Sequence, residues 1–371
     1  MTKILLFFLF VTLIMLPSIS LAYNLNDTLS IEATLTTVIQ HANVENSNSG
    51  NGHKYSDTTR SSESIDISAN FHPTENNEFQ LTYSFAEGEA VNGLNAFTLA
   101  PYADDLEEDL SDINNSGRYN LLEAWYKHDF QFNQQTSFGI TAGIIGSTSF
   151  IDDNEYANDE ISQFMNDIFV NNTLANLPDY DLGTAIELTS SNWTWKAIYM
   201  HSENDDLNDY NYYALQLGYH TETIWGPGNY RIYGYTTDDE FIGTDTSNKE
   251  NLAGIGVSID QQVSESVGMF VRLGIQEDQA PIDHDKMASV GLSIMGSSWN
   301  RSADSLGIGI AYLDGASSSG VIDTVSFESY YKFVFSDNFD LSIDAQWIKD
   351  KIPNESDTTG AIIGLRFNAY M

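Results

Sequence analysis

Period-two alternation of apolar and polar residues dominates this chain and limits its possible folds more than any other feature. In VSFESYYKFVF (325–335), Phe327 and Phe333 lie on one face. Glu328 and Lys332 lie on the other. Successive side chains of a β-strand point to opposite faces, so such a segment forms a strand with one apolar and one polar face. The pattern predicts an all-β protein.

Sixteen segments carry this alternation, and their connections differ in length. The segments are 28–41, 62–72, 78–87, 121–132, 137–146, 181–190, 192–202, 210–221, 228–238, 250–260, 266–277, 286–296, 304–314, 324–335, 339–350 and 359–370. Connections such as SSN and SDN are short, whereas 88–120 and 147–180 are long. An even number of strands with short turns at one end and long loops at the other is typical of outer-membrane barrels.

The width of a sixteen-stranded barrel decides which face meets which solvent. Side chains do not fill such a lumen, so the polar face lines water and the apolar face meets lipid. An open soluble sandwich is the alternative. The C-terminal stretch AIIGLRFNAYM argues against it, because Ile363, Leu365 and Phe367 share one face close to the last residue. We therefore predict a 16-stranded antiparallel transmembrane β-barrel.

The N-terminal residues differ from the rest of the chain. Lys3 precedes the apolar run ILLFFLFVTLIML, and the small-residue motif SLA stands directly before Tyr23. This predicts a cleaved signal peptide over 1–22 and a barrel domain over 23–371, in the outer membrane of a Gram-negative bacterium. An uncleaved N-terminal anchor is the alternative. No later run reaches 18 apolar residues, so no transmembrane helix is expected in the mature chain.

The formal net charge of −38 arises from 53 acidic and 15 basic residues. Nucleic acid is not an expected partner, because binding to phosphates requires a basic surface. Most acidic residues lie in the long loops and would surround one mouth of the barrel. This arrangement is explained either by solvation of the loops or by a cation-favouring vestibule. The absence of Cys excludes disulfide frameworks and Cys-based zinc sites.

One long connection carries the residues of a known family. FGITAGIIGSTSFIDDNEYANDEISQFMNDIFVNN (138–172) resembles the OprB-like carbohydrate-selective porins. The residues that match are Gly143, Phe150, Asn154, Tyr156, Ala157, Asn158, Asp159, Glu160, Gln163, Phe164, Met165 and Asn166. LGIGIAYLDG, FESYYKFVFSDNFDLSIDAQWIKD and AIIGLRFN in the C-terminal half are also similar to that family.

The resemblance implies a sixteen-stranded porin with an inward-folded, partly helical constriction loop. The apolar residues Ile161, Phe164, Met165 and Phe169 have helical spacing and would lean on the inner wall. The loop carboxylates would face the water path, opposite inward arginines. The expected constriction residues are Asp152, Asp153, Asn154, Glu155, Tyr156, Asn158, Asp159, Glu160, Gln163 and Asn166.

Strand parity places a further set of residues in the lumen, because Lys or Arg facing lipid at mid-depth costs about 2–4 kcal/mol. The expected pore-lining residues are Glu123, Trp125, Lys127, Glu187, Lys196, Arg231, Tyr233, Arg272, Glu328, Lys332, Asp344 and Arg366. Phe270 and Tyr330 share this parity. The charged residues either form structural ion pairs or contact solute. Inward aromatic rings either stack on sugars or fill space.

The sequence predicts passive diffusion of small hydrophilic solutes, with carbohydrates as the preferred class, through a lumen with an acidic mouth. A general cation-preferring porin, an adhesin or receptor barrel, and a soluble secreted β-protein are the alternatives. No enzyme is predicted, because nucleophile motifs and His-x3-His metal spacings are absent. No metal site or cofactor is predicted, although acidic loops would suit Ca²⁺. The expected assembly is a monomer or a homotrimer.

Overall fold

The computed structural model describes residues 23–45, 57–103, 119–204, 206–245 and 248–371. The predicted signal peptide lies outside the described residues. So does the acidic stretch at 104–118, which was expected at the mouth of the barrel.

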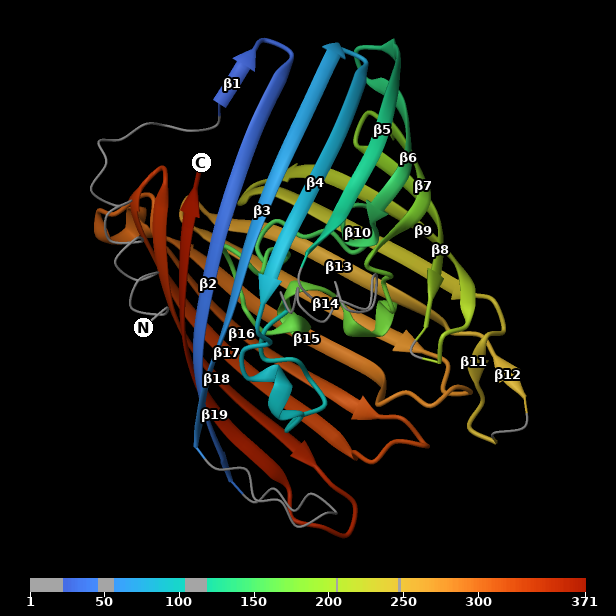
Figure 1. The fold of residues 1–371 in the computed structure, drawn as a ribbon, viewed down its shortest axis with the longest axis vertical. Coiled ribbons are helices and arrows are strands. Elements are labelled where there is room, and N and C mark those ends of the chain that lie inside the picture. Colours follow the sequence, from blue (N-terminus) through green and yellow to red (C-terminus); the bar gives the residue numbers. More distant parts are fainter. Residues whose placement is uncertain (1–22, 46–56, 104–118, 205, 246–247) are drawn as a thin grey trace.

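Within the described residues, sixteen long strands form one closed antiparallel sheet (Figure 1). They are β2 (Leu29–Glu45), β3 (Thr58–Thr74), β4 (Asn77–Glu87), β5 (Tyr119–Asn133), β6 (Thr136–Gly146), β7 (Tyr180–Ser190), β8 (Trp193–Glu203), β9 (Asp209–Thr223), β10 (Gly226–Thr237), β13 (Ala253–Ser264), β14 (Val267–Gln276), β15 (His284–Met295), β16 (Ser305–Gly315), β17 (Asp323–Ser336), β18 (Phe339–Lys351) and β19 (Thr358–Tyr370). Each strand pairs with the next, and β19 pairs with β2 to close the ring. The predicted sixteen-stranded antiparallel barrel is confirmed.

Short strands and short helices lie between the long strands or beside them. β1 (Tyr23–Asn26) pairs with the start of β2, and β11 (Phe241–Ile242) pairs with β12 (Lys249–Glu250). The helical pieces are η1 (Asn92–Leu94), η2 (Ser147–Ser149), α3 (Asp167–Val170), η3 (Thr173–Ala175) and η4 (Gly296–Trp299). Among the described residues, no helix combines the length and the apolar character needed to cross a membrane.

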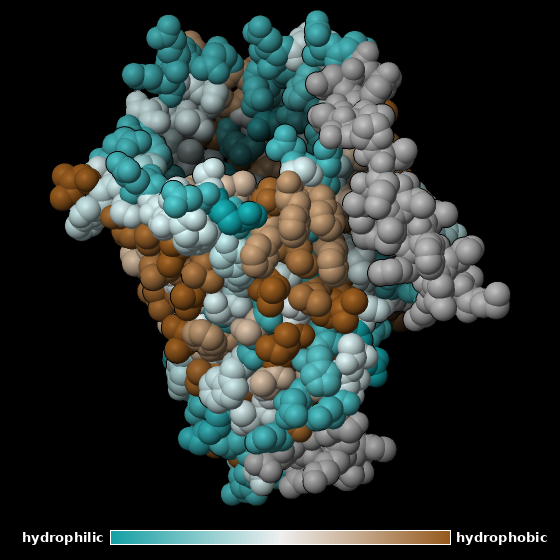
Figure 2. All heavy atoms as spheres, turned by 90° about the vertical axis from the view of Figure 1, so that its left-hand side faces the viewer, coloured by the Kyte–Doolittle hydropathy of each residue, from teal (hydrophilic) through white to brown (hydrophobic). Residues whose placement is uncertain are grey.

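The outer face of the barrel is apolar, as the alternation predicts. On β16, Ile308 and Ile310 are 37% and 51% exposed, whereas Ala311 and Leu313 are buried on the inner side. Figure 2 shows a hydrophobic band across one face, bounded by hydrophilic residues above and below. Exposed aromatic residues stand beside the short turns, where an interfacial girdle is expected. These residues are Phe132, Trp193, Trp225 and Phe335.

A charge at mid-strand on the outer face tests this assignment. Ile310→Lys should lower the free energy of unfolding in lipid vesicles by about 2–4 kcal/mol, because the ammonium group would face hydrocarbon. Ile224→Lys, in the exposed turn between β9 and β10, is the matched control and should change little. Denaturant titration of the reconstituted protein measures both values. Equal effects at the two positions would contradict a lipid-facing band.

Candidate functional site

The chain between β6 and β7 (147–179, hereafter the β6–β7 segment) contacts inward-facing side chains on strands far around the barrel. On β9, Gln216 accepts a hydrogen bond from a backbone N–H of the segment (2.8 Å). On β19, Arg366 donates to the backbone oxygens of Glu160 and Gln163. These strands are not neighbours of β6 or β7. The segment is therefore tied to distant parts of the wall rather than to its own strands alone.

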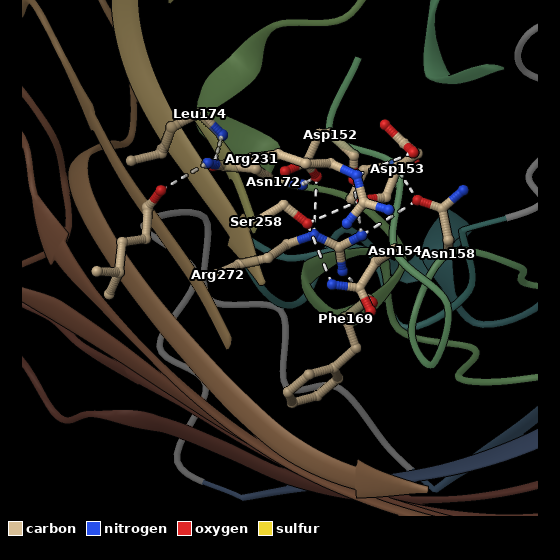
Figure 3. Close-up of polar contacts among 12 residues, drawn as sticks. Asp152, Asp153, Asn154, Asn158, Phe169, Asn172, Leu174, Arg231, Ser258 and Arg272 are labelled. Carbon is tan, nitrogen blue, oxygen red and sulfur yellow. Dashed lines mark hydrogen bonds and ion pairs between the residues drawn. The ribbon is translucent and has the colours of Figure 1, made fainter. Parts of the chain in front are cut away.

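Arg272 on β14 is the centre of this docking (Figure 3). Its Nε lies 2.8 Å from Asp152 Oδ2, and both side chains are fully buried. Its other nitrogens donate to the backbone oxygens of Phe169 (2.8 Å) and Asp152 (3.1 Å) and to Asn158 Oδ1 (3.1 Å). One guanidinium group thus joins the start, the middle and the second half of the β6–β7 segment to the wall. Asp152 has a left-handed backbone, with φ of 65°, at this point.

The two adjacent carboxylates at the start of the segment have different environments. Burial raises the pKa of Asp152, and the nearby Arg272 offsets this only in part. Burial also acts to raise the pKa of Asp153, but Lys196 and Arg231 outweigh it and the pKa is lowered. The Asp153 carboxylate lies 3.4 Å from Lys196 Nζ and 3.0 Å from Arg231 Nε, and these three side chains keep some exposure. This second cluster can therefore present both signs of charge to water.

Glu328 on β17 shapes the middle of the segment. Its carboxylate accepts hydrogen bonds from the backbone N–H groups of Met165 (2.6 Å) and Asn166 (3.0 Å). Those N–H groups are therefore not available for a helix. The predicted helical stripe over 161–169 is correct only for its end, because the α-helix is confined to Asp167–Val170. The apolar side chains of the stripe are nevertheless buried, except the partly exposed first one.

Inward glycines on the wall make room for the segment. A Cβ atom at Gly268 would overlap the ring of Tyr156, and one at Gly309 would lie 2.8 Å from the ring of Phe169. Gly274 lies against Asn172 and Gly364 against Met165 in the same way. These glycines fall at inward positions of strands, where the sequence analysis considered only charged and aromatic residues. The recurrence of glycine at inward positions of β14, β16 and β19 was the signal that could have located the docking surface.

A second segment, residues 88–103 after β4, also docks on the inner wall. The backbone oxygen of Pro101 accepts hydrogen bonds from Gln40 (3.0 Å) and Gln346 (2.8 Å), which face inward on β2 and β18. The backbone N–H of Ala103 donates to the β6–β7 segment (2.7 Å). In the sequence, this stretch is recognisable only as part of a long loop. Its contacts with β2, with β18 and with the β6–β7 segment were missed.

The inward side chains of β3, β4, β5 and β7 form a different kind of wall, hereafter the open wall. The two oxygens of Glu123 accept hydrogen bonds from Thr82 Oγ1 (3.0 Å) and Trp125 Nε1 (3.2 Å). Lys127 Nζ lies 2.9 Å from Glu187. All but Thr82 are partly exposed, and these bonds join residues of the wall to one another. The open wall is therefore polar and keeps contact with water.

Loop carboxylates were expected to face arginines across water. This expectation is wrong for Asp152, Arg272 and Arg366. Asp152, Arg272 and Arg366 have no exposed surface. The reason is direct contact, because these arginines bind the segment itself and are covered by it. Sequence parity correctly identifies the face on which an arginine lies, but it does not show what covers that face.

The remaining predicted residues differ in their exposure to solvent. Glu155 is exposed and Lys332 is partly exposed, whereas Tyr233, Glu328 and Asp344 are buried. The following residues join the hydrogen bonds within the segment or to the wall: Asn154, Tyr156, Asn158, Asp159, Glu160, Gln163 and Asn166. The part of the chain that the structure describes holds no group of three acidic or His side chains able to bind a metal ion. Calcium in the acidic loops stays a prediction.

Comparison with known proteins identifies the family. The model described as "Carbohydrate-selective porin, OprB family" matches residues 65–371. The chain belongs to this family. An uncharacterized protein of Aquifex aeolicus (strain VF5) is 33% identical over 255 residues, which are 68% of this chain and 72% of that protein.

Solved porin structures share the fold. The high-pH structure of Pseudomonas putida OprB superposes with a TM-score of 0.75 at 13% identity, covering 94% of this chain and 95% of that one. OmpT of Vibrio cholerae lacking loop L8 gives a TM-score of 0.56 at 13% identity, covering 93% of this chain and all of that one. Membership in the OprB family and the barrel fold point to the outer membrane and to a porin.

Removal of the central guanidinium tests how this OprB-family porin holds its segment. Arg272→Met should disfavour the docked state by about 3–5 kcal/mol, because Asp152 would be left buried without its partner. We expect proteolytic sensitivity within the segment and a higher single-channel conductance. The added change Asp152→Asn should restore much of the protection. Lys286→Met, which removes an exposed ion pair with Asp314, is the control. Unchanged protection in Arg272→Met would contradict the anchoring role.

Proposed function

We propose that this outer-membrane porin passes small hydrophilic solutes, saccharides in particular, by diffusion through a lumen narrowed by the β6–β7 segment and residues 88–103. The observation that supports the proposal most is the reach of the β6–β7 segment. It begins beside β6 and contacts β8, β9, β14, β17 and β19 through side chains that face inward. A connection with such contacts lies across the interior rather than outside it.

The strands that the two segments cover and the open wall then have separate roles in the lumen. A sixteen-stranded barrel is too wide for its side chains to fill, and porins of this size keep an aqueous channel. The segments cover the inner faces of β14 and β16–β19, where Phe270, Glu328 and Arg366 have lost all exposure. On the open wall, Glu123, Lys127 and Glu187 stay partly exposed. We therefore place the water path between the β6–β7 segment and the open wall.

A preference for neutral saccharides follows from the charges beside this path. Asp153 with Lys196 and Arg231, and Lys127 with Glu187, bring both signs into partly exposed positions. Such pairs supply donors and acceptors to hydroxyl groups without a strong net attraction for one ion. The family description, carbohydrate-selective porin, supports the same solute class. The proposal includes no chemical step and no energy source beyond the solute gradient.

An acidic mouth adds a weaker preference for cations. Carboxylates such as Asp206 and Asp239 stand in the loops, and nearby Lys249 is paired with Glu240. A surface of one sign raises the local concentration of counter-ions over about one Debye length, roughly 8 Å in physiological salt. We therefore expect a mild cation preference that fades as the salt concentration rises.

Replacing residues 152–169 by a short Gly-Ser linker tests the proposal. The barrel should still assemble, because the strand pairs do not depend on the segment. Single-channel conductance in planar bilayers should rise, and uptake in liposome swelling assays should no longer discriminate among sugars by size. A variant that assembles with unchanged conductance would show that the segment does not limit the pore.

A further inference from the structure

The four aromatic residues that the sequence analysis expected in the lumen lie in unequal positions. Tyr233 and Tyr330 are 2% exposed and Phe270 is fully buried. Each of these rings occupies the space above an inward glycine of a neighbouring strand. Trp125 on β5 is instead partly exposed. Of these four rings, only that of Trp125 can meet a solute.

Trp125 lies at the level where the β6–β7 segment leaves the wall. One side of the ring packs against a buried cluster that contains Phe150 and Ile151, the start of that segment. Its register partner on β6 is Gly143, which has no side chain to cover the indole. The indole is thus held at the narrow part of the proposed path, with part of its surface free.

A carboxylate is fixed beside the indole. Trp125 Nε1 donates to one oxygen of Glu123 (3.2 Å), and Thr82 Oγ1 donates to the other (3.0 Å). Each carboxylate oxygen has two lone-pair sites, so both oxygens keep capacity for a further donor. The two protein bonds fix the orientation of the carboxylate. An aromatic face and an oriented acceptor together match a ring sugar, which has an apolar C–H face and hydroxyl groups at its edge.

We propose that Trp125 and Glu123 form the solute-recognition point of the pore and select saccharides in ring form over open-chain polyols of similar size. This inference rests on the proposed function and deepens it. The indole packs on the C–H face of the ring, and the Glu123 carboxylate accepts hydrogen bonds from its hydroxyl groups. An open-chain polyol offers similar hydroxyl groups but no rigid face, so it gains the hydrogen bonds without the packing.

Block of the ion current by added solute measures this selection. Glucose and glucitol are compared on the full-length protein in planar bilayers. Trp125→Ala should raise the half-blocking concentration of glucose about three- to tenfold and abolish the preference for glucose over glucitol. Trp125→Phe should keep the preference. Glu123→Gln should weaken block by both solutes by about two- to threefold, because a neutral oxygen accepts less strongly than a charged one.

Controls separate local from general effects. Trp195→Phe changes an outward Trp that is 42% exposed, and Glu222→Gln changes an exposed carboxylate beside a short turn. Neither should alter block. If glucose blocks the wild type, and Trp125→Ala and Glu123→Gln have the same half-blocking concentration as the wild type, the recognition point is elsewhere. The porin proposal survives in that case. If the wild type passes solutes in liposome swelling without preferring glucose in the block assay, the recognition point does not exist. If the wild type passes no solute at all, the proposed function fails.

Discussion

Closure of the sheet between β19 and β2 is the constraint on which the rest of the structure depends. Twelve residue pairs join these strands, from Thr359 with Glu45 to Tyr370 with Thr34. An open edge in lipid would leave its backbone N–H and C=O groups without partners, at several kcal/mol for each group. Closure with sixteen strands removes that cost but creates an interior too wide for strand side chains to fill. The alternation of faces then requires an apolar exterior and a polar interior.

Two segments, residues 88–103 and the β6–β7 segment, contact inward-facing side chains of the strands, and several of these side chains are charged and buried. A buried ion pair is stable only where further hydrogen bonds satisfy its remaining groups. The Arg272–Asp152 pair gains hydrogen bonds from Arg272 to the backbone oxygens of Asp152 and Phe169 in the β6–β7 segment. The buried Arg366 donates to two further backbone oxygens in the middle of the segment. The buried Glu328 accepts hydrogen bonds from two backbone N–H groups of the segment. The same contacts position the segment against β14, β17 and β19.

The sequence predicts the strands well and the covering of the inner wall poorly. All sixteen segments were located to within a few residues, because period-two alternation persists wherever one face meets lipid. Parity also identified Arg272 and Glu328 as inward. It could not distinguish an arginine that lines water from one that binds a docked segment, since that difference depends on contacts more than 100 residues apart in the chain. The stretch 88–103 was missed for the same reason, because its partners Gln40 and Gln346 lie on distant strands.

The β6–β7 segment is proposed to lie on the inner wall of the barrel, and a cross-link between two introduced cysteines tests this most directly. The chain contains no Cys, so an introduced pair has no background. Asn166 Nδ2 donates to Gln346 Oε1 on β18 at 3.1 Å, and both side chains are buried. Because these two side chains meet through their amide groups, cysteines at the two positions need a short linker to join them. In outer membranes, a short bis-methanethiosulfonate reagent should cross-link Asn166→Cys with Gln346→Cys in most molecules, measured by the changed mobility of the unfolded chain on gel electrophoresis. Asn166→Cys with Ala345→Cys, whose second thiol faces outward, should not be cross-linked. Reaction of both thiols at 166 and 346 without a cross-link would contradict the placement of the segment.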